Sequence, residues 1–239
     1  MGNEHGEWIM RGVDERSPLC LHSAAELVSL VDELGFLPLF RNEIPGFSVE
    51  DRTPPERWWS DDEERDPWRW RETVAAGEKA AYGKFFGGRA GFVSLRWLPY
   101  LANVRRNGYD FDSLCDEGLA PRRSRLIMEA IGERELFSFE LRREAGFGRG
   151  GERNFEGVLT ELMMQTYLVI RDFRQRVSRA GKPYGWPIAV YARPEHIWGA
   201  DAVTSAYAEE PASSRERIVR HILSAFPGAK AEDVQKIVR

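Results

Sequence analysis

The stretch NFEGVLTELMMQTYLVIRDF, residues 154–173, decides the fold, because its hydrophobic periodicity changes halfway along. In the first half, apolar side chains recur at the three- and four-residue spacing of one helix face. These residues are Phe155, Val158, Leu159, Leu162 and Met163. Residues 167–170 are consecutive apolar or β-favouring residues, which is typical of a strand. With Asn154 as the expected N-cap, the stretch predicts a helix that leads directly into a strand.

Two shorter helices and a second strand surround this stretch. Apolar residues predict one helix near residues 126–131, and Ser138 is expected to cap another helix that closes near Gly146. A turn near Gly181 should lead to a second strand at residues 186–191. Three helices followed by a hairpin are typical of a winged helix, a helix-turn-helix whose hairpin extends its surface. We therefore predict an α+β protein with a winged helix over residues 121–198.

The remainder of the chain is expected to form three further parts. They are a loose tail over residues 1–20, a half with helices and a hairpin over residues 21–120, and C-terminal helices over residues 199–239. Ser213 and Glu216 predict a capping box within the C-terminal part, whose helices are expected to cover the core or to carry a homo-oligomer or protein interface.

Local signals place two elements in the half formed by residues 21–120. Ser23 and Glu26 predict a capping box at the start of a helix, and Gly35 is placed to end it. Gly87 and Gly88 can supply the positive φ angles of a tight hairpin turn. A second, degenerate winged helix is one interpretation of this half, and the fold would then be tandem.

The overall composition sets limits on location and cofactors. With 34 basic and 38 acidic side chains, the net charge is −4, so nucleic-acid binding would require local segregation of charge. No apolar span or signal peptide is evident, and Cys20 and Cys115 are too few for a disulfide framework, so we expect a cytoplasmic protein without a membrane segment. The four histidines lack ligand-like spacing, and we expect neither a metal nor a cofactor.

Positive charge is concentrated in the predicted winged helix. Residues 141–182 contain nine basic and five acidic side chains, an excess of four positive charges. Their positions before the third helix and along the hairpin suit contact with backbone phosphates of duplex DNA. The candidate nucleic-acid-binding residues are Arg142, Arg143, Arg149, Arg153, Asn154, Arg171, Arg174, Arg176, Arg179 and Lys182. A protein-interaction module without nucleic acid remains an alternative, because Glu156 and Glu161 would repel the phosphates lining a major groove.

A tryptophan-rich loop over residues 41–72 allows two interpretations. Its aromatic side chains could hold an irregular segment on the core, or they could form the wall of a pocket in which a carboxylate acts as a general base and aromatic rings stack on a flipped base. The candidate pocket residues are Glu43, Trp58, Trp59, Asp61, Asp62, Trp68, Trp70, Tyr82 and Lys84.

Two further segments carry a family resemblance. LVDELGFLPLF (residues 30–40) and YGKFFGGRAGFVSLRWLPYLANVRR (residues 82–106), together with the winged helix, resemble the AlkZ (YcaQ-type) winged-helix DNA glycosylases and, more closely, the shorter AlkZ-related proteins. The resemblance covers residues 23–198 and implies tandem winged helices, a cytoplasmic location, contact with duplex DNA, and a role in DNA repair or regulation.

The catalytic triplet of those glycosylases is missing from the corresponding position. In the family, Gln-x-Gln or Gln-x-Asp follows a Leu-Gly-aliphatic-Leu stretch and positions the attacking water. If LGFL, residues 34–37, is that stretch, Pro38, Leu39 and Phe40 occupy the triplet. We therefore expect DNA binding without AlkZ-type catalysis, and the alternative is a glycosylase-like hydrolase that uses relocated carboxylates.

Overall fold

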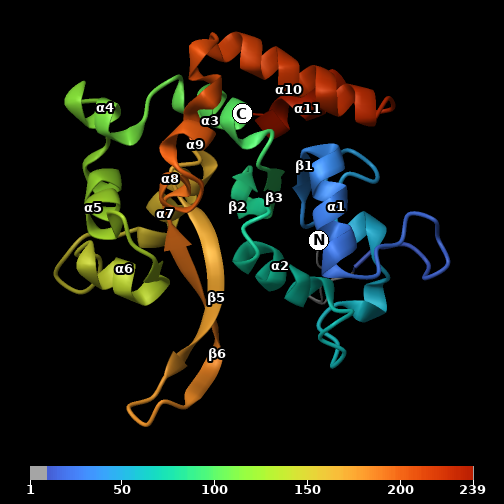
Figure 1. Ribbon diagram of the computed structural model, residues 1–239, viewed down its shortest axis with the longest axis horizontal. Coiled ribbons are helices and arrows are strands. Elements are labelled where there is room, and N and C mark those ends of the chain that lie inside the picture. Colours follow the sequence, from blue (N-terminus) through green and yellow to red (C-terminus); the bar gives the residue numbers. More distant parts are fainter. Residues whose placement is uncertain (1–9, 239) are drawn as a thin grey trace.

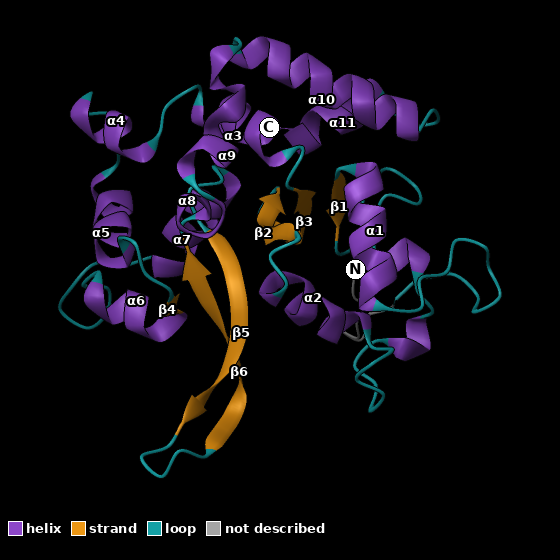
Figure 2. Cartoon of the chain, in the orientation of Figure 1, coloured by secondary structure: helices purple, strands orange, loops and turns teal. Residues whose placement is uncertain are grey.

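Helices and two small antiparallel sheets make up the chain in the computed structural model, which describes residues 10–238 (Figures 1 and 2). The first sheet has the order β1-β3-β2 and consists of β1 (Phe36–Pro38), β2 (Ala80–Phe86) and β3 (Arg89–Ser94). The second sheet has the order β4-β6-β5 and consists of β4 (Leu136–Phe137), β5 (Val169–Val177) and β6 (Pro183–Ala192). The predicted α+β class is therefore confirmed.

The helices lie before, between and after the two sheets. In the first half they are α1 (Ala24–Leu34), the 3-10 turns η1 (Glu50–Arg52) and η2 (Pro55–Arg57), α2 (Pro67–Ala76), α3 (Leu98–Arg106) and α4 (Phe111–Asp116). Around the second sheet are α5 (Arg122–Ile131), α6 (Ser138–Glu144) and α7 (Phe155–Met164). The C-terminal elements are α8 (Pro194–Trp198), α9 (Ala200–Thr204), η3 (Ser205–Ala208), α10 (Pro211–Ala225) and α11 (Ala231–Val238). Among the described residues, no helix is long and apolar enough to cross a membrane.

The stretch at residues 154–173 forms the predicted helix followed by a strand. All five apolar residues of the predicted stripe are buried in α7, and β5 begins after a four-residue connection. The hairpin turn also lies where it was predicted, because Gly181 has φ 76° and donates its amide to the Ser178 carbonyl at 2.9 Å. The switch in hydrophobic period therefore located this corner correctly.

Two predicted helix caps, Ser138 and Ser213, are wrong, and a third has the predicted position without the expected hydrogen bond. Asn154 occupies the N-cap of α7, but its φ is 65° and its side chain makes no capping hydrogen bond. Ser138 lies inside α6, whose N-cap is Phe137, because Phe137 is still paired with Val190 in the sheet. Ser213 lies inside α10, which begins two residues earlier at Pro211, a residue suited to the first turn. By contrast, the caps at Ser23 and Gly35 and the turn at Gly87-Gly88 are confirmed.

Two successive units repeat the same order of elements. The first unit runs from α1 to β3 and the second from α5 to β6; in each, a helix and a short strand are followed, after one or two short helical segments, by a ten-residue helix and a hairpin. In each sheet the short first strand pairs with the last strand, which lies in the middle. Helices α2 and α7 both have ten residues and end in the same way. After α2, Gly77 has φ −77° and Glu78 has φ 56°; after α7, Gln165 has φ −77° and Thr166 has φ 62°.

The two units pack on each other reciprocally. Helix α2 of the first unit lies against β5 of the second, α7 of the second lies against β2 of the first, and β2 also contacts β5. At one of these contacts the Arg71 guanidinium lies 3.8 Å from the Trp68 ring centroid and 4.0 Å from that of Phe173. At the other, Lys84 Nζ donates to Thr160 Oγ1 at 3.3 Å. Helices α2 and α7 are thus each covered by the hairpin of the other unit.

The C-terminal helices cover the face of the first sheet that points away from α1 and α2. Along β2, Tyr82 joins the hydrophobic cluster that contains Leu27 and Trp70, whereas Phe85 joins the cluster that contains Ile218 of α10. Strand β2 is therefore buried on both sides, which explains its nearly continuous apolar sequence. The prediction that the C-terminal helices cover the core is confirmed for this sheet.

Candidate nucleic-acid interface

The β5–β6 hairpin extends away from the other elements, with α6 on one side of its base and α2 on the other (Figure 1). Residues 173–192 contain four basic and no acidic side chains. Three of these basic residues, Arg176, Arg179 and Lys182, are exposed in the outer half of the hairpin. Arg176 also lies over the Phe139 ring of α6 at 4.9 Å, which orients its guanidinium while leaving it open to solvent. The charged side chains of this outer hairpin, residues 175–186, are thus all cationic.

A second basic surface lies around the loop between α6 and α7. Arg142, Arg143, Arg149, Arg153 and Asn154 are all exposed there, as an interface requires. The loop is held in shape by backbone hydrogen bonds, including Glu152 N to Gly146 O at 3.0 Å. The loop sequence GFGRGG, residues 146–151, matches the glycine spacing of a dinucleotide-binding fingerprint. Because it follows a helix, it lacks the strand that must precede such a fingerprint.

Two further cations belong to this surface and were missed by the sequence analysis. Arg123 Nε donates to Glu152 at 2.8 Å, and Arg122 donates to the same carboxylate. The hydrogen bonds from these two guanidinium groups hold the pKa of Glu152 below its usual range. One carboxylate shared by two arginines leaves an excess of positive charge. The run PRRSR at residues 121–125 was the available signal.

Two of the predicted DNA-binding arginines bind protein groups instead. Arg171 is mostly buried; it donates to the carbonyl of Ala76 at 3.1 Å and pairs with Glu78 and Glu135. Arg174 is more exposed and pairs with Glu135 at 2.5 Å, as well as with an aspartate on its own strand. Arg171 therefore donates hydrogen bonds to carbonyl groups at the C-terminal end of α2 and connects the two units. These contacts leave it little capacity to bind a phosphate.

Helix α7 presents little surface to a ligand. Its exposed side chains are Glu156 and Glu161, and the face that carries Gly157 and Thr160 is partly covered. Thr160 contacts the first hairpin through Lys84. The outward face of α7 is therefore narrow and acidic, which is unfavourable for insertion into the major groove.

The tryptophan-rich loop is anchored on the core, as one of the two interpretations proposed. Trp58 and Trp70 are buried, and their indole groups donate to Thr53 Oγ1 at 2.9 Å and to the Glu64 carbonyl at 2.7 Å. The sequence analysis missed that residues 67–76 form α2, although Asp66-Pro67 is a typical helix start. Asp66 Oδ1 accepts from Trp68 N at 2.8 Å and Trp59 N at 3.1 Å.

The predicted pocket residues do not gather into one site. Trp59 is half exposed, Trp68 is partly buried, and both belong to an aromatic cluster with Phe40 and Trp58. Glu43, Asp61 and Asp62 are exposed, and Lys84 binds α7. Tyr82 is buried against Phe92, and burial raises its pKa.

The three triplet positions face protein rather than solvent. Pro38 ends β1 and is buried, and Leu39 is fully buried. The Phe40 ring centroid lies 5.6 Å from that of Trp58 and 6.4 Å from that of Trp68. None of these three side chains has a polar atom that could hold a water molecule.

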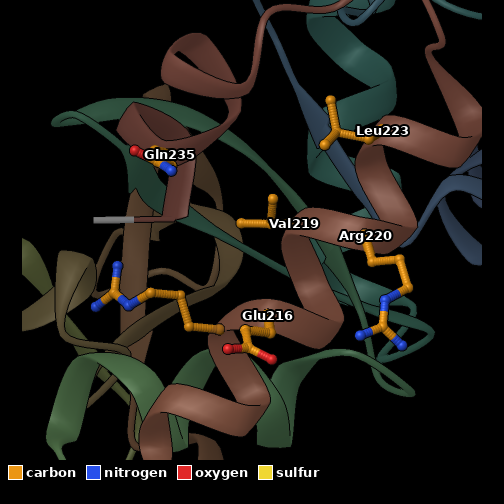
Figure 3. A pocket seen from close by; sticks show the side chains of 6 residues that line it. Glu216, Val219, Arg220, Leu223 and Gln235 are labelled. Atoms are coloured by element: carbon orange, nitrogen blue, oxygen red, sulfur yellow. The ribbon is translucent and has the colours of Figure 1, made fainter.

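The described residues form at least two hollows on the surface. One, of about 650 Å³, lies at the end of the molecule opposite the hairpin tip, and it mixes charged with apolar side chains (Figures 1 and 3). Its lining residues are Arg215, Glu216, Val219, Arg220 and Leu223 of α10 and Gln235 of α11. The other, which we call the hairpin pocket, has a volume of about 530 Å³. It is lined by Glu63 and Arg69 from the first unit and by Phe173, Gln175, Gly185, Trp186 and Pro187 from the hairpin.

The comparison with protein families agrees with the resemblance of residues 30–40 and 82–106. A model of the family described as AlkZ related matches residues 21–239. The chain belongs to the AlkZ-related family. Through this family the chain is related to the AlkZ DNA glycosylases. No curated protein and no solved structure matches the chain significantly.

Proposed function

We propose that this AlkZ-related chain binds duplex DNA, with little preference for sequence, through the outer hairpin and the loop between α6 and α7. The observation that carries the proposal is the exposed cationic group Arg176, Arg179 and Lys182 on the projecting hairpin, whose residues 173–192 include no acidic side chain. Such side chains neutralise backbone phosphates, which positions a protein on a duplex without reading its sequence. Arg149 and Arg153 supply further phosphate contacts from the adjacent loop.

We further propose that both units are winged helices. The order of a helix, a short strand, further helices and a hairpin, with the first strand paired to the last, supports this assignment in each unit. Helix α7 then corresponds to a recognition helix, but its exposed Glu156 and Glu161 disfavour entry into the major groove. In the first unit, α2 occupies the position that α7 has in the second unit, and β5 covers it. In the proposed mode of binding, contacts from the β5–β6 hairpin therefore replace contacts from the recognition helix.

We propose that the chain performs no base excision of the AlkZ type, whether it acts in DNA repair or in regulation. Pro38, Leu39 and Phe40 provide no hydrogen-bonding side chain where the resemblance puts the triplet that holds water. A hydrolase with relocated carboxylates has less support, because Asp61 and Asp62 are exposed and neither surface hollow is lined by Trp58 or Trp68.

The proposal is tested by titrating fluorescently labelled duplexes of unrelated sequence with the full chain at low salt. We expect binding to every duplex with similar affinity, because phosphate contacts carry the interaction. A lack of binding to all duplexes would reject DNA binding. A strong preference for one sequence would reject the phosphate-based mode and point to base contacts.

A further inference from the structure

Trp186 lies within a strand, yet 81% of its surface is exposed. The pairing register explains this exposure. Arg174 pairs with Ile188 and Arg176 pairs with Tyr184, so three residues of β6 lie opposite the single residue Gln175. Gly185, with φ 76°, provides the backbone conformation that this β-bulge requires. Bulges redirect side chains, and here the redirected side chain is the largest apolar one available.

The bulge is held in place from the neighbouring strand. Gln175 Nε2 donates to the Gly185 carbonyl at 2.7 Å. This bond leaves the side-chain oxygen of Gln175 available as an acceptor. Pro187 follows Trp186 directly and restricts the backbone on that side. The exposed indole is thus presented from a constrained segment of the hairpin.

The hairpin pocket lies beside this tryptophan and has a second wall from the first unit. Phe173 contributes an aromatic surface whose position is fixed by Arg71, at 4.0 Å from the ring centroid, and by the Tyr82 ring at 6.0 Å. On the opposite wall, Arg69 pairs with Glu63 at 3.4 Å. The volume of about 530 Å³ is within the roughly 300–1,000 Å³ that small-molecule sites occupy.

The chemistry of these walls suits one kind of ligand. Trp186, Phe173 and Pro187 provide surfaces on which a flat ring can stack, and the Glu63 carboxylate and the Gln175 side-chain oxygen accept hydrogen bonds. Arg69 provides a donor. The one cation among these lining residues, Arg69, is already paired with Glu63 and Glu72, so a phosphate would find no uncompensated positive charge, whereas the exocyclic amino group of a nucleobase would find an acceptor. The complementary ligand is therefore a planar aromatic ring that carries an amino group on its edge.

We propose that the hairpin pocket binds one unpaired nucleobase, stacked on Trp186, and favours bases that carry an exocyclic amino group. A base within an intact duplex cannot reach this site, because both its faces and its pairing edge are occupied. This inference rests on the proposed DNA binding and adds to it a preference for DNA that contains an unpaired base. DNA with an extrahelical base would be held by the outer hairpin through its phosphates and by the pocket through its base.

The test compares two otherwise identical duplexes, one fully paired and one with a single extrahelical 2-aminopurine. We expect the wild-type chain to bind the second about tenfold more tightly, since stacking of one base on an aromatic side chain is typically worth roughly 5- to 160-fold, and to quench the 2-aminopurine fluorescence. Trp186→Ala should abolish both effects while leaving binding to the paired duplex unchanged. Trp186→Phe should retain part of the preference. Trp59→Ala is the matched control, because Trp59 is half exposed but lies outside the pocket.

Base selectivity provides a second readout. An extrahelical cytosine should bind more tightly than an extrahelical thymine, and Glu63→Ala should reduce that difference. Binding of the paired duplex with no gain from an extrahelical base, or a gain that survives Trp186→Ala, would overturn this inference and leave the proposed DNA binding intact. Failure to bind either duplex would overturn both.

Discussion

Glu78 and Thr166 adopt the same left-handed backbone conformation, with φ of 56° and 62°, at the same point of two successive units. Each is the second residue after a ten-residue helix and lies shortly before the first long strand of a hairpin. Positive φ is uncommon for residues other than glycine and costs most for a β-branched side chain such as threonine. The shared geometry therefore indicates that the two units are structural repeats, although their sequences at this turn differ.

The chain is expected to leave modified bases in place. Purified protein mixed with alkylated or crosslinked duplex DNA should release no free base above background, because Pro38 and Phe40 cannot position a water molecule. The released bases can be separated and quantified by chromatography. Excision that disappears in Glu43→Ala or Asp61→Ala would show that relocated carboxylates perform the chemistry.

Arg106→Ala should destabilise the protein by about 3–5 kcal/mol, the usual cost of removing one partner of a buried ion pair. The Arg106 side chain is fully buried, and it binds Glu195, the carbonyl and hydroxyl of Thr166, and the Tyr207 hydroxyl. The variant would leave the Glu195 carboxylate without this partner. Urea unfolding followed by circular dichroism measures the difference.

Arg217→Ala is the control for that variant, because its ion pair with Glu209 lies on the surface and should contribute little to stability. Equal destabilisation in the two variants would contradict the assigned role of Arg106.

His221 should make the stability of the protein depend on pH. Its ring stacks on Trp97 with centroids 4.2 Å apart, and Nε2 donates to the Leu34 carbonyl at 2.9 Å. Burial lowers the pKa of His221 below its usual value of 6.5, and Arg96 adds to this effect. The unfolded chain therefore takes up a proton that the folded chain resists, so the free energy of unfolding should fall as the pH decreases below about 6.5.

A comparison of unfolding at pH 7.5 and pH 5 isolates this contribution. In His221→Gln the loss of stability on acidification should be smaller than in the wild type. An unchanged pH dependence would assign the effect to other groups.

Asp66→Ala should reduce the free energy of unfolding by about 2 kcal/mol, because it removes the N-cap of α2 and leaves two backbone amides without their acceptor. Asp66→Asn retains a side-chain oxygen and should reduce it by less than about 1 kcal/mol. Thermal or urea unfolding of the two variants distinguishes them. Similar reductions in both would mean that the negative charge, rather than the cap, carries the contribution.

The sequence predicted the elements whose hydrophobic period is long and regular. The stripe of α7 and the following strand were located because their residues contact the core of their own unit. The short strands β1 and β4 were missed, since three and two residues are too few to show a period. The Ser138 cap was wrong for the same reason: β4 extends the sheet up to the first residue of α6.

The sequence could not show which surfaces the fold leaves free. Arg171 and Arg176 lie on the same strand, β5, but the packing of α2 against β5 buries most of the first and leaves the second exposed. The exposure of Trp186 likewise depends on pairing register, a long-range property. The glycine and proline beside it in YGWP were a signal of a bulge that the sequence analysis missed, because both are uncommon inside regular strands.

The salt dependence of DNA binding tests the central claim most directly. The affinity of the full chain for a paired duplex should fall steeply with salt, and Arg176→Ala combined with Arg179→Ala should flatten the log–log slope by about 1.8, which corresponds to roughly 0.9 for each phosphate that the variant no longer neutralises. Arg217→Ala, a surface arginine on α10 away from the hairpin, should keep the wild-type slope. A double variant with the slope and affinity of the wild type would contradict the assignment of the outer hairpin as the phosphate-binding surface.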